Sequence, residues 1–267
     1  MGTITYTAPE FAVKNISPPS SEHITAIIPA YNEGAHIGAV LNVVNQVNEL
    51  TRILVIDDGS TDDTVTAVQT WLEQDNRVEL IQLPHNKGKG HALWTAAAAA
   101  ATDLLLFLDA DLKGLQPWHI PLLLNPVRQG VAAMSVARFR RGRLPSDLAH
   151  LFLPYLSGQR CLRWPLFSTL FAAASSGWSI EIALNLHAWY NGYPVSRIPW
   201  EGVSHTLRPE KRQGLSGYWS HIHMWWDIGR YLVRFSQHYG LRPRATAHPL
   251  IHQHTPSPTS PQQPIGD

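Results

Sequence analysis

The chain has 267 residues, with 21 Lys and Arg against 20 Asp and Glu, 20 prolines, 10 tryptophans and one cysteine. This length supports one large domain or two small ones with an ample core. The lone cysteine excludes a disulfide scaffold and a cysteine-rich zinc site, and it suits a reducing compartment. A net charge of +1 gives no support for bulk nucleic-acid binding, so no nucleic-acid partner is expected.

Both ends of the chain are expected to be disordered, at residues 1–22 and 241–267. The first segment is polar and lacks the apolar run of a signal peptide, and the second is rich in proline without apolar periodicity. No stretch of about 18 uncharged apolar residues predicts a membrane-spanning helix, because the best candidate, residues 96–108, contains Asp103. We therefore expect a cytoplasmic protein with a single domain at residues 23–240.

The first half of that domain alternates between strands and helices. Buried strands are expected at residues 24–29, 52–56, 78–83 and 104–108. Helices are expected at residues 34–47, 61–72 and 90–101. Continuous apolar strands separated by helices predict an α/β fold with a doubly wound parallel sheet, in which ligands bind beyond the carboxyl ends of the strands.

A polar cluster follows each of the four strands. In chain order the clusters are Pro29-Ala30-Tyr31-Asn32-Glu33, Asp57-Asp58-Gly59-Ser60-Thr61-Asp62, Asn86-Lys87-Gly88-Lys89-Gly90 and Asp109-Ala110-Asp111. Because the carboxyl ends of parallel strands meet at one edge of a sheet, we expect the four clusters to form one site.

Asp109 and Asp111 offer the hard oxygen ligands that Mg²⁺ or Mn²⁺ prefers, and such an ion would neutralise charge on a leaving diphosphate. A lone Asp-x-Asp is more often a turn, but its place after the fourth strand favours the metal site. Lys87 and Lys89 precede a helix and can hold phosphate oxygens, with merely solvated lysines as the alternative. Asp58 can accept hydrogen bonds from a base or ribose.

Asp62 and Asp63 are assigned only to capping of the helix that follows them.

Charge is also distributed unevenly along the chain. Residues 1–111 carry 14 acidic and 5 basic side chains, whereas residues 112–180 carry 8 basic side chains and one acid, Asp147. This asymmetry suggests a cleft where a cation and a phosphorylated ligand meet, although the charge count alone favours a solvated basic loop.

The runs at residues 27–33, 55–64 and 109–111 resemble the family 2 glycosyltransferases, which have the GT-A fold and transfer sugars from nucleotide diphosphate donors. The resemblance implies a mostly parallel, Rossmann-like nucleotide-binding half at 23–111 and a smaller acceptor half at 112–240. Residues 86–90 are called the lysine loop below. Together with this loop, the resemblance predicts nucleotide-sugar contacts for Pro29, Ala30, Tyr31, Glu33, Asp57, Asp58, Lys87, Lys89 and Asp109.

A narrower resemblance, carried by residues 88–94, 177–182 and 202–205, is to the glucosyl-3-phosphoglycerate synthases and their mannosyl relatives. There the matching histidine completes the metal site, so the resemblance implies His205 as a ligand beside Asp109 and Asp111. It also implies that Glu181 faces the donor sugar or the acceptor, with helix capping as the alternative.

We predict catalytic roles for Asp111, Glu181 and Asp147. A phosphate oxygen that attacks the sugar needs no base, whereas a hydroxyl acceptor would need one, with Asp147 and Glu181 as the candidates.

On the acceptor side, Gly142 and Arg143 match a loop that helps to hold the acceptor in the phosphoglycerate enzymes, but Pro145 replaces its threonine. The run Ser157-Gly158-Gln159-Arg160 looks more like the Ser-Gly-x-Arg of polyprenyl-phosphate sugar synthases. An acceptor that carries phosphate or carboxylate is predicted to contact Arg138, Gly142, Arg143 and Arg160.

A helix is predicted at residues 219–235, with a narrow polar stripe and a wide apolar surface. Such a surface is buried in a core or a homodimer, or lies at a membrane as a peripheral contact.

Together, the motifs and the resemblance predict a Mg²⁺- or Mn²⁺-dependent glycosyltransferase that moves a sugar from a nucleotide diphosphate sugar, UDP in preference to GDP, to an anionic acceptor. The alternatives are a polyprenyl-phosphate sugar synthase at the membrane face and a non-catalytic nucleotide-sugar-binding module.

Overall fold

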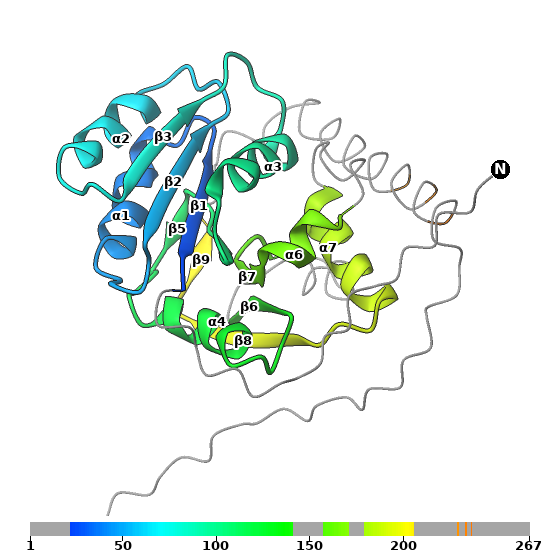
Figure 1. Cartoon of the computed structure of the whole chain (residues 1–267). Coiled ribbons are helices and arrows are strands. Elements are labelled where there is room, and N and C mark those ends of the chain that lie inside the picture. The colour runs from blue at the N-terminus through cyan, green and yellow to red at the C-terminus, as the bar shows by residue number, and fades with distance from the viewer. Residues whose placement is uncertain are drawn as a thin grey trace, which may run out of the picture.

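The computed structural model describes residues 22–140, 157–170 and 179–205, together with residues 229, 233 and 236 (Figure 1). Nearly all of the segments predicted to be disordered, and most of the helix predicted at 219–235, lie outside these residues, so those predictions stay untested. Among the described residues, no helix is long and apolar enough to cross a membrane.

The first half, residues 23–111, has the predicted alternation of strands and helices. Its strands are β1 (Ile24–Ala30), β2 (Arg52–Asp57), β3 (Val78–Gln82) and β4 (Leu104–Phe107). Its helices are α1 (Gly34–Val44), α2 (Thr64–Leu72) and α3 (Lys89–Ala100). Strand β1 pairs in parallel with both β2 and β4, and β2 pairs in parallel with β3.

The second half extends the same sheet. Its larger elements are α4 (His119–Arg128), β6 (Met134–Arg140), β7 (Arg160–Arg163), α6 (Trp164–Ser168), α7 (Ser179–Tyr190) and β8 (Val195–Glu201). The strand order is β3-β2-β1-β4-β7-β6-β8, with β7 antiparallel to both neighbours and β6 parallel to β8. A separate two-stranded sheet pairs β5 (Leu112–Lys113) with β9 (Ser204–His205). The predicted fold class, a mostly parallel α/β sheet, is confirmed.

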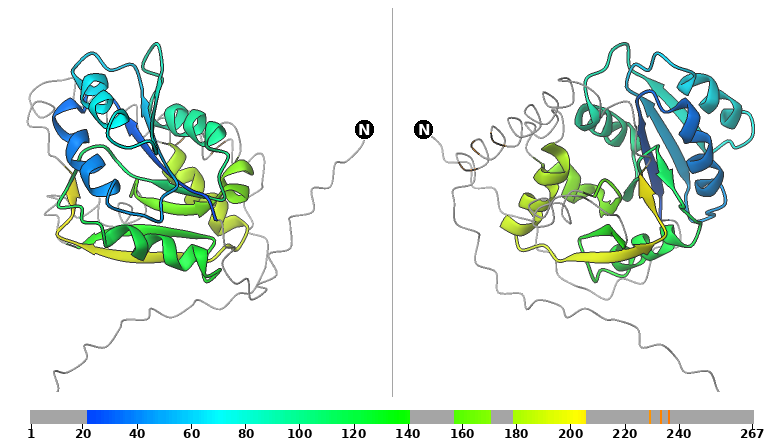
Figure 2. Two further views of the ribbon diagram at one scale, coloured as in Figure 1. Left: turned by 60° about the vertical axis from the view of Figure 1, so that its left-hand side comes forward. Right: turned by 180° about the vertical axis from the view of Figure 1, so that it is seen from behind.

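Helices cover both faces of the large sheet, as Figures 1 and 2 show. Alternate side chains of each central strand enter two separate cores: Ile53 and Val55 of β2 pack on the side of α1, α2 and α4, whereas Leu54 and Ile56 pack on the side of α3, α6 and α7. Burial on both faces explains why these strands read as continuous apolar runs. The polar ends of the strands are thereby left as the accessible part of the sheet.

Asp62 ties the starts of α1 and α2 together. Its carboxylate accepts hydrogen bonds from the backbone N–H of Gly34 at 3.1 Å and of Thr64 at 3.0 Å. Asp63, which directly precedes α2, makes no capping hydrogen bond with its side chain. Of the two acids predicted to cap this helix, Asp62 therefore bonds its first residue.

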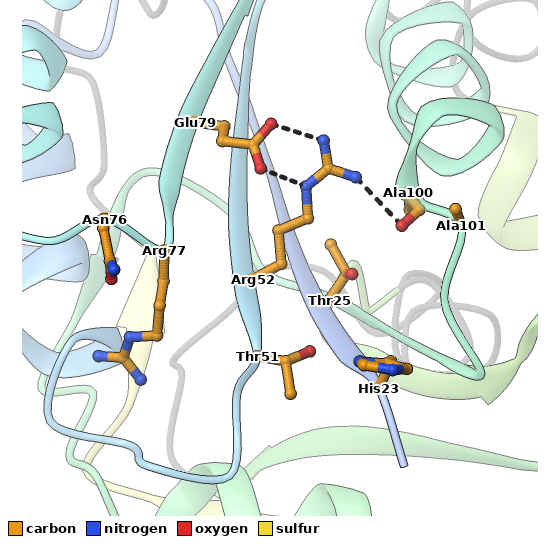
Figure 3. Close-up of a pocket in the computed structure, with 9 residues that line it drawn as sticks. All are labelled: His23, Thr25, Thr51, Arg52, Asn76, Arg77, Glu79, Ala100 and Ala101. Atoms are coloured by element: carbon orange, nitrogen blue, oxygen red, sulfur yellow. Dashed lines mark hydrogen bonds and ion pairs between the residues drawn. The ribbon is translucent and has the colours of Figure 1, made fainter. Parts of the chain in front are cut away.

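A polar cavity of about 320 Å³ lies at the amino edge of the sheet, away from the strand-end clusters (Figure 3). Arg52 fills much of its wall: its guanidinium pairs with Glu79 at 2.6 and 2.7 Å and donates to the carbonyl of Ala99 at 2.8 Å. Arg77 pairs with Asp75 at 2.8 Å. Because both guanidinium groups are bound within the chain, we assign Arg52 to joining β2, β3 and the end of α3, and Arg77 to joining the start of β3 to the α1–β2 loop.

The pH dependence of stability tests the burial of His187 in the core on the side of α3, α6 and α7. His187 of α7 is buried, with Nε2 2.9 Å from the Thr169 hydroxyl, and burial lowers its pKa to about 4. In the unfolded chain a histidine titrates near pH 6.5. As the pH falls below this value only the unfolded state takes up the proton, so stability is lost between about pH 6.5 and pH 4, by about 2 kcal/mol at pH 5.

The measurement is urea unfolding of wild type and His187→Gln at pH 7 and pH 5. The glutamine does not titrate, so the stability difference between the two proteins should narrow at pH 5. A difference that is equal at both pH values would contradict the assignment.

Candidate active site

The strand-end clusters meet at the carboxyl edge of the sheet, as the sequence predicts. The backbone N–H of Asp58, just after β2, donates to the carbonyl of Ala30 at the end of β1 at 2.8 Å. The N–H of Asn32 donates to the Ser60 hydroxyl at 2.9 Å, and the N–H of Thr61 donates to the Asn32 side-chain oxygen at 2.8 Å. The first and second clusters are therefore one hydrogen-bonded unit.

Asp58 extends this unit to the lysine loop. Its buried carboxylate accepts hydrogen bonds from the backbone N–H groups of Lys87 and Gly88, both at 2.8 Å. Asp57, also buried, accepts from the N–H of Ser60 at 3.2 Å. The described contacts of both acids thus shape the loops that enclose the edge of the sheet.

Lys89 lies at the centre of the site. It is the first residue of α3, and its Nζ is 2.7 Å from Oδ1 of Asp109 and 2.8 Å from Oε1 of Glu181. Burial works against the charge on this amine, but the two carboxylates outweigh burial and raise the pKa of Lys89. One cation therefore joins the end of β4 to the start of α7.

Asp109 is held ionised by the same contacts. Burial favours its neutral form, but the nearby charges of Lys89 and His205 prevail and lower the pKa of its carboxyl group. The negative charge is consequently kept at the point where β4 ends.

Asp109, Asp111 and His205 form a cluster whose ligand atoms all lie within 4.8 Å of one another. Nδ1 of His205 is 3.2 Å from Asp111 and 3.8 Å from Asp109. Burial lowers the pKa of His205, but the hydrogen bond to Asp111 and the charges of both acids outweigh it and raise that pKa. Two carboxylates and one imidazole, all partly exposed, fit a divalent cation with open coordination positions.

The small sheet delivers His205 to this cluster. Leu112, which follows Asp111, is paired with His205 across the β5–β9 ladder. Next to it, the backbone of Gly114 packs directly on Gly202, because a Cβ atom at Gly114 would lie 2.1 Å from the Gly202 carbonyl oxygen. Phe139 contacts the imidazole of His205 edge to face, with ring centroids 5.1 Å apart. The position of His205 therefore depends on a close glycine contact and an aromatic neighbour.

Residues 157–160 form a further wall of the site, where Gly158 packs against the Lys89–Asp109 ion pair. The side-chain amide of Gln159 donates to Oδ2 of Asp109 at 2.6 Å. Arg160 is fully buried, and its guanidinium donates to the carbonyls of Ser157 and, at 3.4 Å, Glu181. Burial lowers the pKa of Arg160 to about 10. Its described bonds connect this wall with α7.

The structure thus brings together five residues predicted for the site: Lys89, Asp109, Asp111, Glu181 and His205. Tyr31, at the end of β1, is 42% exposed, and Glu33 bonds His36 through its carboxylate at 3.1 Å. Arg138 is exposed on β6. Gly142, Arg143 and Asp147 lie outside the described residues, so their roles stay predictions.

Sequence reasoning missed the parts played by Gln159 and Gly114. The Ser-Gly-x-Arg run was noticed for its arginine, although its variable position supplies the contact to Asp109. Nothing local in the sequence marks Gly114, because its partner, Gly202, is 88 residues away.

Comparison with known proteins identifies the family. A family model described as glycosyl transferase family 2 matches residues 25–180, more than half of the chain. The chain belongs to glycosyl transferase family 2. The predicted recognition as a family 2 glycosyltransferase is confirmed.

Individual relatives match shorter segments. The glucosyl-3-phosphoglycerate synthase of Mycobacterium tuberculosis (strain H37Rv) is 33% identical over 122 residues, which cover 44% of this chain and 38% of the relative. The dolichyl-phosphate beta-glucosyltransferase of Dictyostelium discoideum is 30% identical over 110 residues, covering 37% and 34%. The match therefore spans less than two fifths of these relatives.

The three-dimensional likeness is broader. The crystal structure of the Mycobacterium tuberculosis glucosyl-3-phosphoglycerate synthase with Mn²⁺, uridine diphosphate and glucosyl-3-phosphoglycerate has a TM-score of 0.64 to this chain. The two are 22% identical, and the match covers 89% of this chain and 88% of that one. At this identity the likeness establishes the GT-A fold.

The glycine contact under the small sheet has a testable consequence for the cluster. We expect Gly114→Ala to push β9 away from β5, to shift His205 relative to Asp111, and to weaken Mn²⁺ binding by about tenfold or more. The measurement is calorimetric titration of Mn²⁺ into the folded variant.

Gly130→Ala is the matched control. Gly130 shares a positive φ (71° against 73° at Gly114) but has no atom within 4 Å of the added Cβ. The free energy of unfolding of Gly130→Ala should fall by about 1 kcal/mol, because a side chain is strained at positive φ. Its Mn²⁺ affinity should equal that of wild type. Equal Mn²⁺ affinity in both variants would contradict a role for the Gly114 contact.

Proposed function

We propose that this glycosyltransferase requires Mg²⁺ or Mn²⁺ and moves a sugar from a nucleotide diphosphate sugar, UDP in preference to GDP, to an anionic acceptor. The observation that carries the proposal is the convergence of Lys89, Glu181 and the Asp109–Asp111–His205 cluster at the carboxyl edge of the sheet. In open α/β sheets ligands generally bind at this edge, which supports the proposal. Structures of similar fold were solved with Mn²⁺ and uridine diphosphate, which supports the choice of donor.

Asp109, Asp111 and His205 are the residues that would hold the metal. When bound, the ion supplies charge neutralisation for the diphosphate leaving group. Lys89 stands beside the cluster at the first turn of α3, where backbone N–H groups are unpaired within the helix and favour anions. We assign Lys89 and Lys87 to phosphate oxygens.

The base and ribose are assigned to the unit formed by the first two clusters. Its proposed contacts are Pro29, Ala30, Tyr31, Glu33, Asp57 and Asp58. The exposed ring of Tyr31 offers a flat apolar face, and the carboxylates accept hydrogen bonds from hydroxyl groups. Because their backbone positions are fixed by the hydrogen bonds between β1 and β2, these groups are preorganised for a ligand.

Glu181 is assigned to the reacting sugars. Its Oε1 pairs with Lys89, while its buried Oε2 has no hydrogen-bond partner among the described residues. A buried oxygen of this kind is costly unless a donor meets it, and a hydroxyl of the donor sugar or the acceptor would serve. Asp111 is assigned to the leaving-group side, and Asp147 is the alternative general base for a hydroxyl acceptor.

For the acceptor we propose a molecule with a phosphate or carboxylate group. A structure of similar fold was solved with phosphoglyceric acid, which supports a small anion. Arg138, Gly142 and Arg143 are assigned to it. Arg160, also predicted for the acceptor, would have to act from its buried position behind Ser157 and Glu181.

A second candidate is a polyprenyl-phosphate acceptor at a membrane face. It is favoured by the Ser157–Arg160 run and by the similarity to a dolichyl-phosphate beta-glucosyltransferase. This candidate would add peripheral membrane contact to a cytoplasmic location. Homodimer formation and membrane contact both depend on the segment at 219–235 and stay predictions.

The donor class is tested by thermal shift with UDP, GDP, ADP and dTDP, each with Mn²⁺ and with EDTA. A ligand at 100 times its dissociation constant stabilises the native state by about 2.7 kcal/mol, which raises Tm by roughly 5–10 °C. We expect this shift for UDP with Mn²⁺ and its loss with EDTA. No shift for any nucleotide, or a shift unaffected by EDTA, would contradict the proposal.

The metal assignment is tested separately with Asp111→Ala. Asp111 is partly exposed, so the variant should fold, but it should lose the Mn²⁺-dependent part of UDP binding in calorimetry. Asp63→Ala, which removes an exposed acid near the same edge, is the control and should bind as wild type does. Unchanged UDP affinity in Asp111→Ala with Mn²⁺ would overturn the assignment.

A further inference from the structure

Gln159 is a buried side chain with two specific bonds beside the metal cluster. It is fully inaccessible and directly precedes β7. Its Nε2 donates to Oδ2 of Asp109 at 2.6 Å, and its Oε1 accepts a hydrogen bond from the Ser157 hydroxyl at 2.9 Å. Neither Gln159 nor Ser157 has a part in the function proposed above.

The two bonds to Asp109 act on different oxygens. Lys89 binds Oδ1, whereas Gln159 binds Oδ2, which is also the oxygen that faces Nδ1 of His205 at 3.8 Å. The torsion that turns an aspartate carboxylate is broad when nothing restrains it. A donor on each oxygen fixes the plane of this carboxylate, and with it the direction in which Oδ2 faces the cluster.

Ser157 anchors the oxygen end of the Gln159 amide. A glutamine side chain carries one acceptor and one donor group at its end, and the Ser157 hydroxyl occupies the acceptor. If the amide turned over, its oxygen would face the Asp109 carboxylate and two acceptors would meet. The acceptor-only carboxylate therefore selects the NH₂ end of the amide, and the serine hydroxyl, bonded to the opposite end, holds the side chain in that place.

The backbone between them is equally constrained. A Cβ atom at Gly158 would lie 2.6 Å from Nζ of Lys89 and 2.7 Å from both carboxylate oxygens of Asp109. The backbone at Gly158 is thus packed against this ion pair, with no space for a side-chain atom. The segment contacts the carboxylate through backbone packing as well as through the glutamine.

We propose that Gln159, anchored by Ser157, is a positioning residue that holds Asp109 for metal binding. The inference rests on the metal site of the proposed function and adds to it a support for one ligand. Partners that orient metal ligands typically contribute 10–100-fold to metal affinity. A role in packing alone would change stability and leave Mn²⁺ affinity as it is.

The test compares Mn²⁺ affinity in full-length Gln159→Met, Ser157→Ala and the double variant, by counting free Mn²⁺ with electron paramagnetic resonance. Methionine keeps the length of the side chain but removes both hydrogen bonds. We expect Gln159→Met to lose about 10–100-fold in Mn²⁺ affinity and Ser157→Ala to lose less. The double variant should lose no more than Gln159→Met, because the serine acts through the glutamine.

Gln129→Met, at an exposed glutamine just after α4, is the matched control and should bind Mn²⁺ as wild type does. Gln159→Met equal to this control, in a protein whose Asp111→Ala variant loses Mn²⁺, would overturn the inference and leave the proposed function standing. Additive losses in the double variant would also overturn it. Failure of wild type to bind Mn²⁺, with or without UDP, would remove the proposed function and the inference together.

Should Gln159→Met fail to fold, Ser157→Ala decides the question. The Ser157 side chain is only partly buried, so its truncation is the milder change. A loss of Mn²⁺ affinity in folded Ser157→Ala supports the inference, and unchanged affinity overturns it.

Discussion

The ion pairs of Lys89 with Asp109 and Glu181 are the contacts on which the site depends. They join the start of α3, the end of β4 and the start of α7, three elements that come from both halves of the chain. Removing one partner would leave an uncompensated charge beside the buried Glu181, which destabilises the folded chain. The network therefore links side chains from the two halves, and it concentrates charge where the donor is proposed to bind.

The parallel strands and the antiparallel strand β7 make different contributions to this edge. The parallel strands bring the loops of the first half together, because their carboxyl ends lie side by side. Strand β7 runs in the opposite sense, so the segment before it, with Gln159, reaches the same edge. The β5–β9 ladder then adds His205 from the far end of the described chain. Gln159 thus constrains Asp109, whereas the β5–β9 ladder constrains His205.

The sequence predicts the first half well and the second half only in part. Strands β1, β2 and β4 are apolar on both faces, so each can be recognised as an apolar run in the sequence. The parallel topology then predicts that the polar residues after these strands meet at one edge. Strand β7 is only four residues long and contains Arg160, so no local pattern marks it as central. Its contacts with β4 and β6 depend on pairing between distant residues. The same holds for Gly114 and Gly202, whose close approach exists only in the folded chain.

The most direct test of the central claim is a crystal structure with UDP and Mn²⁺, with anomalous scattering used to locate the ion. We expect one strong peak coordinated by Asp109, Asp111 and His205 and in contact with the diphosphate. We also expect Lys89 within hydrogen-bond distance of a phosphate oxygen. A nucleotide bound elsewhere, or an ion held by other residues while these three make no contact with it, would contradict the account.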